Sequence, residues 1–214
     1  MIGKKVIIVE PHFDDAWLDL GGYILLNKSK SFFLLTLSDH PTNKEDGTKI
    51  LSRYLPNLSG RFLGYKSLGF DDDSLDNLIK KYHTEDYEEL FSRLNRKSSL
   101  DSIARDIESN CSEFDTVFWP LGLKHPQHIL MDKLRLQREG IVLYREYPYF
   151  LYEDQKHLLE EKTAGKQEKA VDIKEVMDIK IDLFKKAYPR QSFILSLGIG
   201  GKDLKDIKKE VYWE

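Results

Sequence analysis

The sequence predicts an α/β fold in which a mostly parallel sheet carries helices on both faces. Two runs rich in apolar residues, Lys5–Glu10 and Ser31–Leu37, are continuous rather than alternating, which is typical of strands buried on both faces. The segment between them, Asp15–Lys30, has the length of one crossover helix. A third run of the same kind, Asp115–Leu121, follows an amphipathic segment. Strands that alternate with helices in this way predict three layers around one parallel sheet.

The connecting segments carry helical periodicity. Because Asp15–Lys30 joins two parallel strands, the opening unit is expected to be a right-handed β-α-β crossover. The segment before the third strand, Ser98–Asn110, and a later one, Asp172–Tyr188, both have an apolar face. In the later segment the apolar residues fall largely on one side, with lysines and acidic residues opposite: Ile173, Val176, Met177, Ile179, Ile181, Leu183 and Phe184.

Other segments have weaker signals. Arg61–Tyr65 predicts a short strand and Tyr87–Asn95 a helix. The segment Leu158–Asp172 is charged and poor in aromatic residues, so we expect a solvated helix end or a mobile loop there.

Length, charge and cysteine content narrow the class of protein. The 214 residues suit a single domain spanning residues 1–214. A formal net charge of −3 gives no field that would attract nucleic acid or an anionic membrane. Cys111 is the only cysteine, which favours a reducing compartment, and no apolar run has the length of a signal sequence or a membrane span. We therefore expect a cytoplasmic protein with no nucleic-acid partner and no membrane span, and the sequence leaves open whether it forms a homo-oligomer.

Ionisable residues crowd the end of the first predicted strand. His12, Asp14 and Asp15 follow it directly, and in open α/β sheets such turns point into the crevice where ligands bind. Imidazole and carboxylate suit zinc or another divalent first-row metal, and a catalytic zinc needs three protein ligands. Alternatively, Asp14 or Asp15 caps the helix that follows.

A second histidine-rich turn follows the third predicted strand. His125 and His128 are three residues apart, and a helix that begins near Pro126 would place both at its N-terminal edge. Each motif alone is weak evidence for a metal site. Both motifs follow buried strands of one sheet, so we expect them to meet at its carboxyl edge, where one would supply the ligand that the other lacks.

These motifs resemble those of the PIG-L/LmbE-like zinc-dependent N-deacetylases. That family has a strand followed by A-H-P-D-D-E and, much later, a strand followed by an H-x-D-H-like segment; this chain has "PHFDDA" and "HPQH". Further similar segments occur in the same order along nearly the whole chain: "LGG" at 20–22, "LLTLSDH" at 34–40, "FLGY" at 62–65, "REYPYFLY" at 145–152, "KIDLFKKAYPRQ" at 180–191 and "EVYW" at 210–213.

The resemblance implies a three-layer Rossmann-like fold and a role for each residue of the two motifs. His12, Asp15 and His128 would hold Zn²⁺, or another divalent metal, Asp14 would be the general base, and His125 the polarising or acid residue. The implied activity is removal of an N-acetyl group from an amino sugar conjugate of the N-acetylglucosamine type. The implied partner is thus a small N-acetylated sugar conjugate.

Three departures from the family pattern support an alternative. Phe13 stands where the family has Pro, Ala16 where it has Glu, and Gln127 where it usually has an acid. Ala16 removes a carboxylate that would steady the site, unless another residue supplies one. A catalytically degenerate member that binds a sugar or metabolite is therefore the alternative. A nucleotide- or S-adenosylmethionine-dependent enzyme also fits the α/β pattern, but no glycine-rich phosphate loop follows the first strand.

Aromatic residues near the predicted site could stack on a sugar ring. Trp119, Tyr147, Tyr149 and Tyr152 are candidates, although a Trp in a buried strand and Tyr residues in turns are more often structural. Phe13 is the aromatic residue that we most expect at the rim of the site.

Overall fold

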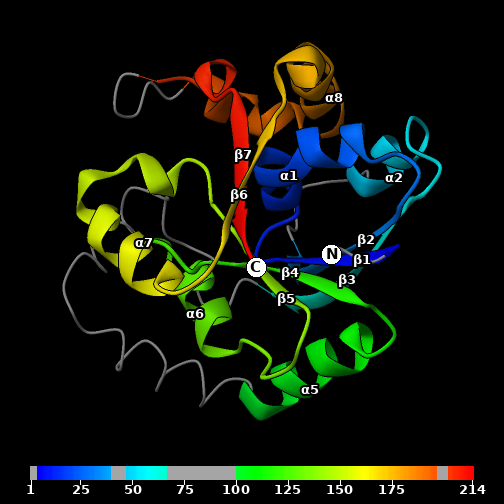
Figure 1. The fold of residues 1–214 in the computed structure, drawn as a ribbon. Coiled ribbons are helices and arrows are strands. Elements are labelled where there is room, and N and C mark those ends of the chain that lie inside the picture. The colour runs from blue at the N-terminus through cyan, green and yellow to red at the C-terminus, as the bar shows by residue number, and fades with distance from the viewer. Residues whose placement is uncertain (1–3, 40–46, 67–99, 197–201) are drawn as a thin grey trace.

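The apolar runs of the sequence form the parallel part of a seven-stranded sheet (Figure 1). The computed structural model describes residues 4–39, 47–66, 100–196 and 202–214. The strand order is β3-β2-β1-β4-β5-β7-β6, and all neighbours from β3 to β5 are parallel. The parallel strands are β1 (Lys5–Glu10), β2 (Ser31–Asp39), β3 (Leu58–Lys66), β4 (Thr116–Pro120) and β5 (Ile141–Tyr144).

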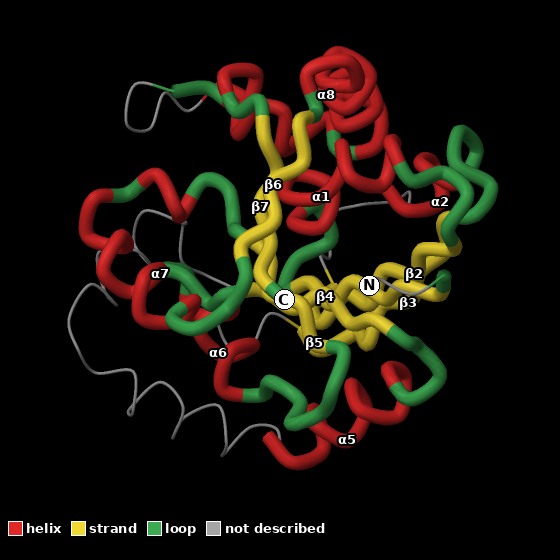
Figure 2. Tube along the Cα trace, viewed as in Figure 1, coloured by secondary structure: helices red, strands yellow, loops and turns green. Residues whose placement is uncertain are grey.

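Helices cover both faces of the sheet, as the sequence predicts (Figure 2). Alternate residues of β1 point to opposite faces: Val6 and Ile8 pack in one apolar cluster, and Ile7 and Val9 in another. The first cluster holds residues of α1, α2 and α8, and the second holds residues of α5 and α6. The helices are α1 (Asp15–Leu26), α2 (Gly47–Ser52), α5 (Leu100–Cys111), α6 (Pro126–Lys133), α7 (Lys156–Thr163) and α8 (Met177–Ala187).

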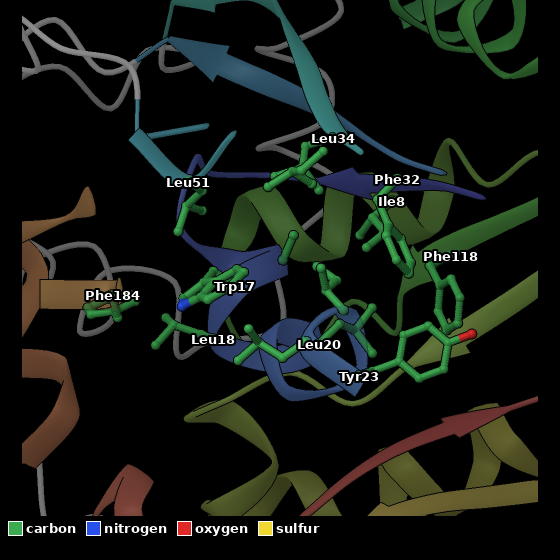
Figure 3. Packing of buried hydrophobic residues seen from close by; sticks show 14 of the residues in the cluster. Ile8, Trp17, Leu18, Leu20, Tyr23, Phe32, Leu34, Leu51, Phe118 and Phe184 are labelled. Atoms are coloured by element: carbon green, nitrogen blue, oxygen red, sulfur yellow. The ribbon is translucent and has the colours of Figure 1, made fainter. Parts of the chain in front are cut away.

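Helix α1 is buried along almost its whole length in the first cluster (Figure 3). Trp17 and Leu20 are fully buried there, and the ring of Tyr23 lies 5.4 Å from that of Phe118 on β4. Because α1 follows β1 directly, this packing fixes the turn between them. The first candidate turn is therefore anchored by a helix that is packed into the core.

The strand order places the two candidate turns next to each other. β1 pairs with β2 on one side and β4 on the other, with Val6 opposite Thr116 and Ile8 opposite Phe118. The order of the strands reverses between β1 and β4, and ligands bind at such a switch point, outside the carboxyl ends of the strands. The turn that carries His12 follows β1 and the turn that leads to His128 follows β4, so the two turns lie on either side of this switch point.

A buried ion pair joins α1, α8 and the last strand. Nζ of Lys180 lies 2.6 Å from Oε1 of Glu210, and the Glu210 carboxylate also accepts the backbone N–H groups of Gly22 and Tyr23 at 2.8 and 2.6 Å. A Cβ at Gly22 would lie 2.5 Å from Ile173, so only glycine allows this approach.

The predicted orientation of the late helix is wrong at two positions. Lys180 is buried, whereas Ile179, predicted on the apolar face, is 48% exposed. The buried residues Ile173, Met177, Lys180, Phe184 and Ala187 recur every three or four positions, so Lys180 lies on the inward stripe and Glu210 compensates its charge. The regular helix also begins later than predicted, at Met177, after a short 3-10 turn at Lys174–Val176.

The segment Leu158–Asp172 is more ordered than its composition predicts. Besides the last residues of α7 it contains β6 (Glu168–Asp172), which pairs antiparallel with β7 (Lys209–Trp213). The remaining irregular elements are 3-10 turns at Tyr149–Leu151, Glu153–Gln155, Pro189–Ser196 and Leu204–Asp206. The helix predicted at Tyr87–Asn95 lies outside the described residues. Within the described ranges, no helix is both long and apolar enough to span a bilayer.

Candidate metal centre

Buried carboxylates close the turn between β1 and α1. Oε2 of Glu10, the last residue of β1, accepts the backbone N–H of Ala16 at 2.8 Å, and its Oε1 accepts the Thr36 hydroxyl at 2.6 Å. Oδ2 of Asp15 accepts the backbone N–H of His12 at 2.8 Å and lies 3.0 Å from Nδ1 of the same residue. Residues 10–16 thus form a loop that hydrogen-bonds to itself.

Asp14 does not have the capping role that was the alternative for it. It occupies the N-cap position of α1, but its side chain makes no capping hydrogen bond. The N–H group of Ala16, in the first turn of the helix, already donates to the Glu10 carboxylate. The Asp14 carboxylate is buried beside the charges of Asp15, His12 and His128, with which it interacts.

The second turn begins α6 where the sequence predicts. His125 is the N-cap, Pro126 opens the helix, and Nδ1 of His125 accepts the backbone N–H of Gln127 at 3.3 Å. This bond uses the backbone of residue 127, so an acidic side chain at that position is not needed to make it.

His128 is fully buried, one turn into α6, and its Nδ1 is hydrogen-bonded to Oε1 of Glu146. Oε2 of Glu146 accepts the backbone N–H of Leu123 at 2.9 Å. Glu146 lies two residues beyond β5, so a third strand end contributes to the same site.

The two turns bring three donor atoms into one small triangle. Nε2 of His128 lies 3.2 Å from Nδ1 of His12 and 3.3 Å from Oδ2 of Asp15, and the remaining side measures 3.0 Å. Donors on a tetrahedral zinc with ordinary bond lengths lie about 3.3–3.4 Å apart. The spacing and chemistry of the three donors therefore fit such an ion.

His125 belongs to the same cluster but lies farther out. His12, His125 and His128 each place one ring nitrogen within 4.8 Å of a ring nitrogen of the other two. The three histidines therefore form a candidate metal site. The ring centroids of His12 and His125 are 4.7 Å apart. Of the three, His12 is the one with intermediate exposure, and its side chain is 24% exposed, so solvent reaches the cluster from its side.

Burial and charge separate the pKa values of the two adjacent aspartates. Burial, reinforced by the charge of Asp15, raises the pKa of Asp14 to about 7. Burial acts in the same direction on Asp15, but the charges and hydrogen bonds of His128 and His12 outweigh it and hold the pKa of Asp15 well below its usual range. One carboxylate is thus firmly ionised, whereas its neighbour exchanges a proton near neutral pH.

The pKa values of the two histidines of the second turn also move in opposite directions. Burial lowers the pKa of His128, but Asp15 and Glu146 overcome this effect and raise it to about 10 in the metal-free protein. Burial and the charges of His12 and His128 lower the pKa of His125 well below its usual value. His125 is therefore neutral, and because its Nδ1 accepts a hydrogen bond, its proton lies on Nε2.

Sequence reasoning missed two buried carboxylates: Glu146, which contacts His128 of the site, and Glu10, which supports the turn after β1 through the backbone N–H of Ala16. Both stand at strand ends, where His12 was found, but Glu10 reads as part of the strand and β5 itself is too short to stand out. Ala16 lacks the carboxylate that the family pattern has at this position. Glu146 supplies a carboxylate to His128 of the site instead.

Phe13, Trp119 and Tyr152 take structural positions, whereas Tyr149 lies against the site. Phe13 is only 5% exposed and packs against Tyr188, so the expectation that it lies at the rim is wrong. Trp119 is in the core, and the ammonium of Lys124 lies 4.3 Å from the ring centre of Tyr152. The ring of Tyr149 lies against the site, 4.8 Å from that of His128.

Known proteins share this architecture at low sequence identity. No family model matches the sequence, and no curated protein sequence does either. The zinc-inhibited form of the teicoplanin deacetylase Orf2 superposes with a TM-score of 0.60 at 15% identity, over 98% of this chain and 97% of that one. A deacetylase of the teicoplanin biosynthesis pathway gives 0.59 at 15% identity, over 98% and 96%. For the N,N'-diacetylchitobiose deacetylase of Pyrococcus horikoshii the values are 0.53 and 15%, over 98% and 82%. The chain thus has the fold of LmbE-like deacetylases, as the sequence resemblance implies.

Proposed function

We propose that this protein is a metal-dependent N-deacetylase that hydrolyses the N-acetyl group of an amino sugar conjugate. The observation that carries the proposal is the triangle of donor atoms between β1 and β4 with a carboxylate beside it that is not one of the three. A triangle of ligands leaves a fourth position open, as hydrolytic metal sites require. Asp14 is then the neighbouring base.

His12, Asp15 and His128 are the proposed ligands. The distances between their donor atoms, 3.0–3.3 Å, suit one small ion. A ligand set of His12, His125 and His128 suits it less well, because its donor atoms lie up to 4.8 Å apart. Two imidazoles and a carboxylate favour zinc among the common divalent ions. The metal, when bound, would polarise the substrate carbonyl and make a water molecule acidic enough to attack it at neutral pH.

Asp14 is proposed to move the protons of the reaction. As a carboxylate it accepts a proton from the attacking water, and as a carboxylic acid it returns a proton to the amine nitrogen when the C–N bond breaks. In the metal-free protein, burial and the charge of Asp15 raise the pKa of Asp14 to about 7, so this carboxyl group can hold or release a proton near neutral pH.

His125 is proposed to stabilise the oxygen of the acyl group. Its neutral ring offers an Nε2–H donor, because Nδ1 is occupied by the N–H of Gln127. A fixed donor that meets the negative charge developing on the carbonyl oxygen lowers the barrier without reorganising.

The substrate class rests on the similar folds. Two of the similar structures are named for teicoplanin deacetylation and one for N,N'-diacetylchitobiose, and the latter is an N-acetylated sugar. We therefore propose a small N-acetylated amino sugar conjugate for this chain as well.

Acetate release from metal-loaded protein tests the proposal. The metal-free protein is loaded with zinc, manganese or cobalt and assayed on a panel of N-acetylglucosamine conjugates. We expect turnover with at least one metal, and Asp14→Asn should lower kcat by about 100-fold or more while the bound metal is retained. Asp182→Asn, an exposed carboxylate on α8, is the control that should keep full activity.

Two outcomes would count against this function. Absence of acetate with every metal, although the protein binds the sugars, would favour the alternative of a sugar-binding protein. Full activity of Asp14→Asn would remove Asp14 from the proton transfer.

A further inference from the structure

Glu146 is a fully buried carboxylate that contacts one of the proposed ligands without being a ligand itself. Building on the proposed function, we propose that Glu146 is a positioning residue that fixes the tautomer of His128 and thereby sets the affinity of the centre for its metal.

Both oxygens of Glu146 are committed. Oε1 faces Nδ1 of His128, and Oε2 accepts the backbone N–H of Leu123 at 2.9 Å. An ionised carboxylate only accepts hydrogen bonds, so Nδ1 must carry the proton. The lone pair of the neutral ring is then on Nε2, the atom that lies 3.2 Å from His12 and 3.3 Å from Asp15. Glu146 thus assigns the metal-binding role to the nitrogen that faces the triangle.

The orientation of the His128 ring is fixed from two sides. Glu146 holds its Nδ1 edge, and the ring of Tyr149 contacts it in a T-shaped arrangement at 4.8 Å between centroids. The bond to Leu123 also ties the turn before α6 to the end of β5, so the backbone and the side chain of the second turn share one anchor. A ring held in this way loses no rotational freedom when it binds a metal.

Glu146 also accounts for the tolerance of Ala16. The N–H of Ala16 is bound by Glu10, and neither Ala16 nor Glu10 has a recorded hydrogen bond to a histidine among the described residues. The carboxylate that raises the basicity of a ligand comes instead from the third strand end. We therefore expect this centre to bind metal tightly despite the alanine.

The variant Glu146→Gln tests the proposal because glutamine can satisfy only one of the two contacts as glutamate does. If its carbonyl stays on the Leu123 N–H, its NH₂ faces Nδ1 of His128 and moves the ring proton to Nε2. Loss of such outer partners weakens metal binding by about 10–100-fold. We expect a loss of that size for Zn²⁺, measured by competition with a chromophoric chelator.

Glu10→Gln is the matched control. Glu10 is equally buried and also accepts a backbone N–H of a strand-end turn, yet within the described ranges its oxygens bond to Ala16 and Thr36 rather than to a histidine. It should change zinc affinity by no more than about twofold, even where it lowers stability. In a His128→Ala background Glu146→Gln should have no further effect on zinc affinity.

The tautomer is measured directly on the unaltered protein. Nitrogen-15 NMR of the zinc-loaded wild type should show the proton of His128 on Nδ1, a measurement that needs no variant to fold. A proton on Nε2, or a Glu146→Gln protein with wild-type zinc affinity, would overturn the role of Glu146 while leaving the deacetylase proposal intact. A wild-type protein that binds no divalent metal would overturn both.

Discussion

The two turns that form the centre are held together in different ways. In the first, most partners are local: Asp15 bonds to His12, and Glu10 to Ala16, within residues 10–16, while Glu10 also accepts the Thr36 hydroxyl of β2. In the second, the partner of His128 is Glu146, eighteen positions along the chain, at the end of another strand. The first turn is thus held largely by its own residues, whereas His128 of the second depends on a residue from another strand end.

The largest expected effect comes from breaking the contact between the two turns. In the metal-free protein Asp15 forms a buried ion pair with His128 and a hydrogen bond with the partly exposed His12. Asp15→Asn should lower the free energy of unfolding by about 3–5 kcal/mol, because it leaves His128 charged without this partner. Urea unfolding of the metal-free variant measures this, and the variant should also lose tight zinc binding. Unchanged stability would show that the two turns are held by other contacts.

A smaller effect concerns the proton on the second turn. The pKa of His128 is raised to about 10 in the metal-free protein, so a metal must displace that proton to reach Nε2. Zinc binding near pH 7.5 should release about one proton, and the affinity should rise by about tenfold per pH unit up to the pKa. Calorimetry in buffers of different ionisation enthalpy measures the number of protons released. His157→Gln is the control, because His157 is exposed on α7 and its loss should leave that number unchanged. Binding that weakens as the pH rises would contradict this account.

The same proton links the stability of the metal-free protein to pH. The folded state binds it more tightly than the unfolded chain, so the ion pairs of His128 stabilise fully below pH 6.5. This contribution is lost as the pH rises toward about 10.

The smallest expected effect lies in the backbone before His125. Lys124 has a φ of 52°, its N–H donates to Oε1 of Gln155 at 2.9 Å, and its ammonium lies 2.7 Å from Asp154. Lys124→Gly removes the strain of a left-handed backbone, which is about 1–2 kcal/mol. It also removes the ion pair with Asp154 and the packing on Tyr152, which act in the opposite direction. The free energy of unfolding should therefore change by less than about 1 kcal/mol. Thermal unfolding measures this. A larger loss would show that the Lys124 side chain anchors the second turn.

The same difference between local and distant partners explains what the sequence could predict. β1, β2 and β4 carry continuous apolar runs, and the five predicted site residues lie in two short stretches that follow β1 and β4, at 12–15 and 125–128. Glu146 could not be assigned, because its role depends on β5 being next to β4. Phe13 was misplaced since its packing partner, Tyr188, comes from a distant helix end.

Lys180 shows a further reason why local patterns fail. A lysine on a helix predicts exposure, and here the buried ammonium is compensated by Glu210 on β7, thirty positions along the chain. β6 itself was missed because its exposed and half-buried residues, Glu168 to Asp172, give no apolar run. Short outer strands obtain their stability from a neighbouring strand rather than from their own composition.

That outer strand has a consequence for how copies of the protein meet. Among the described strands, β6 is the last one on its side of the sheet, and the open side of such a margin invites strands from other molecules. Within its five residues it carries Glu168, Lys169 and Asp172, and charges on a short margin oppose intermolecular strand addition. The composition that hid β6 from sequence analysis thus guards the protein against aggregation through this side.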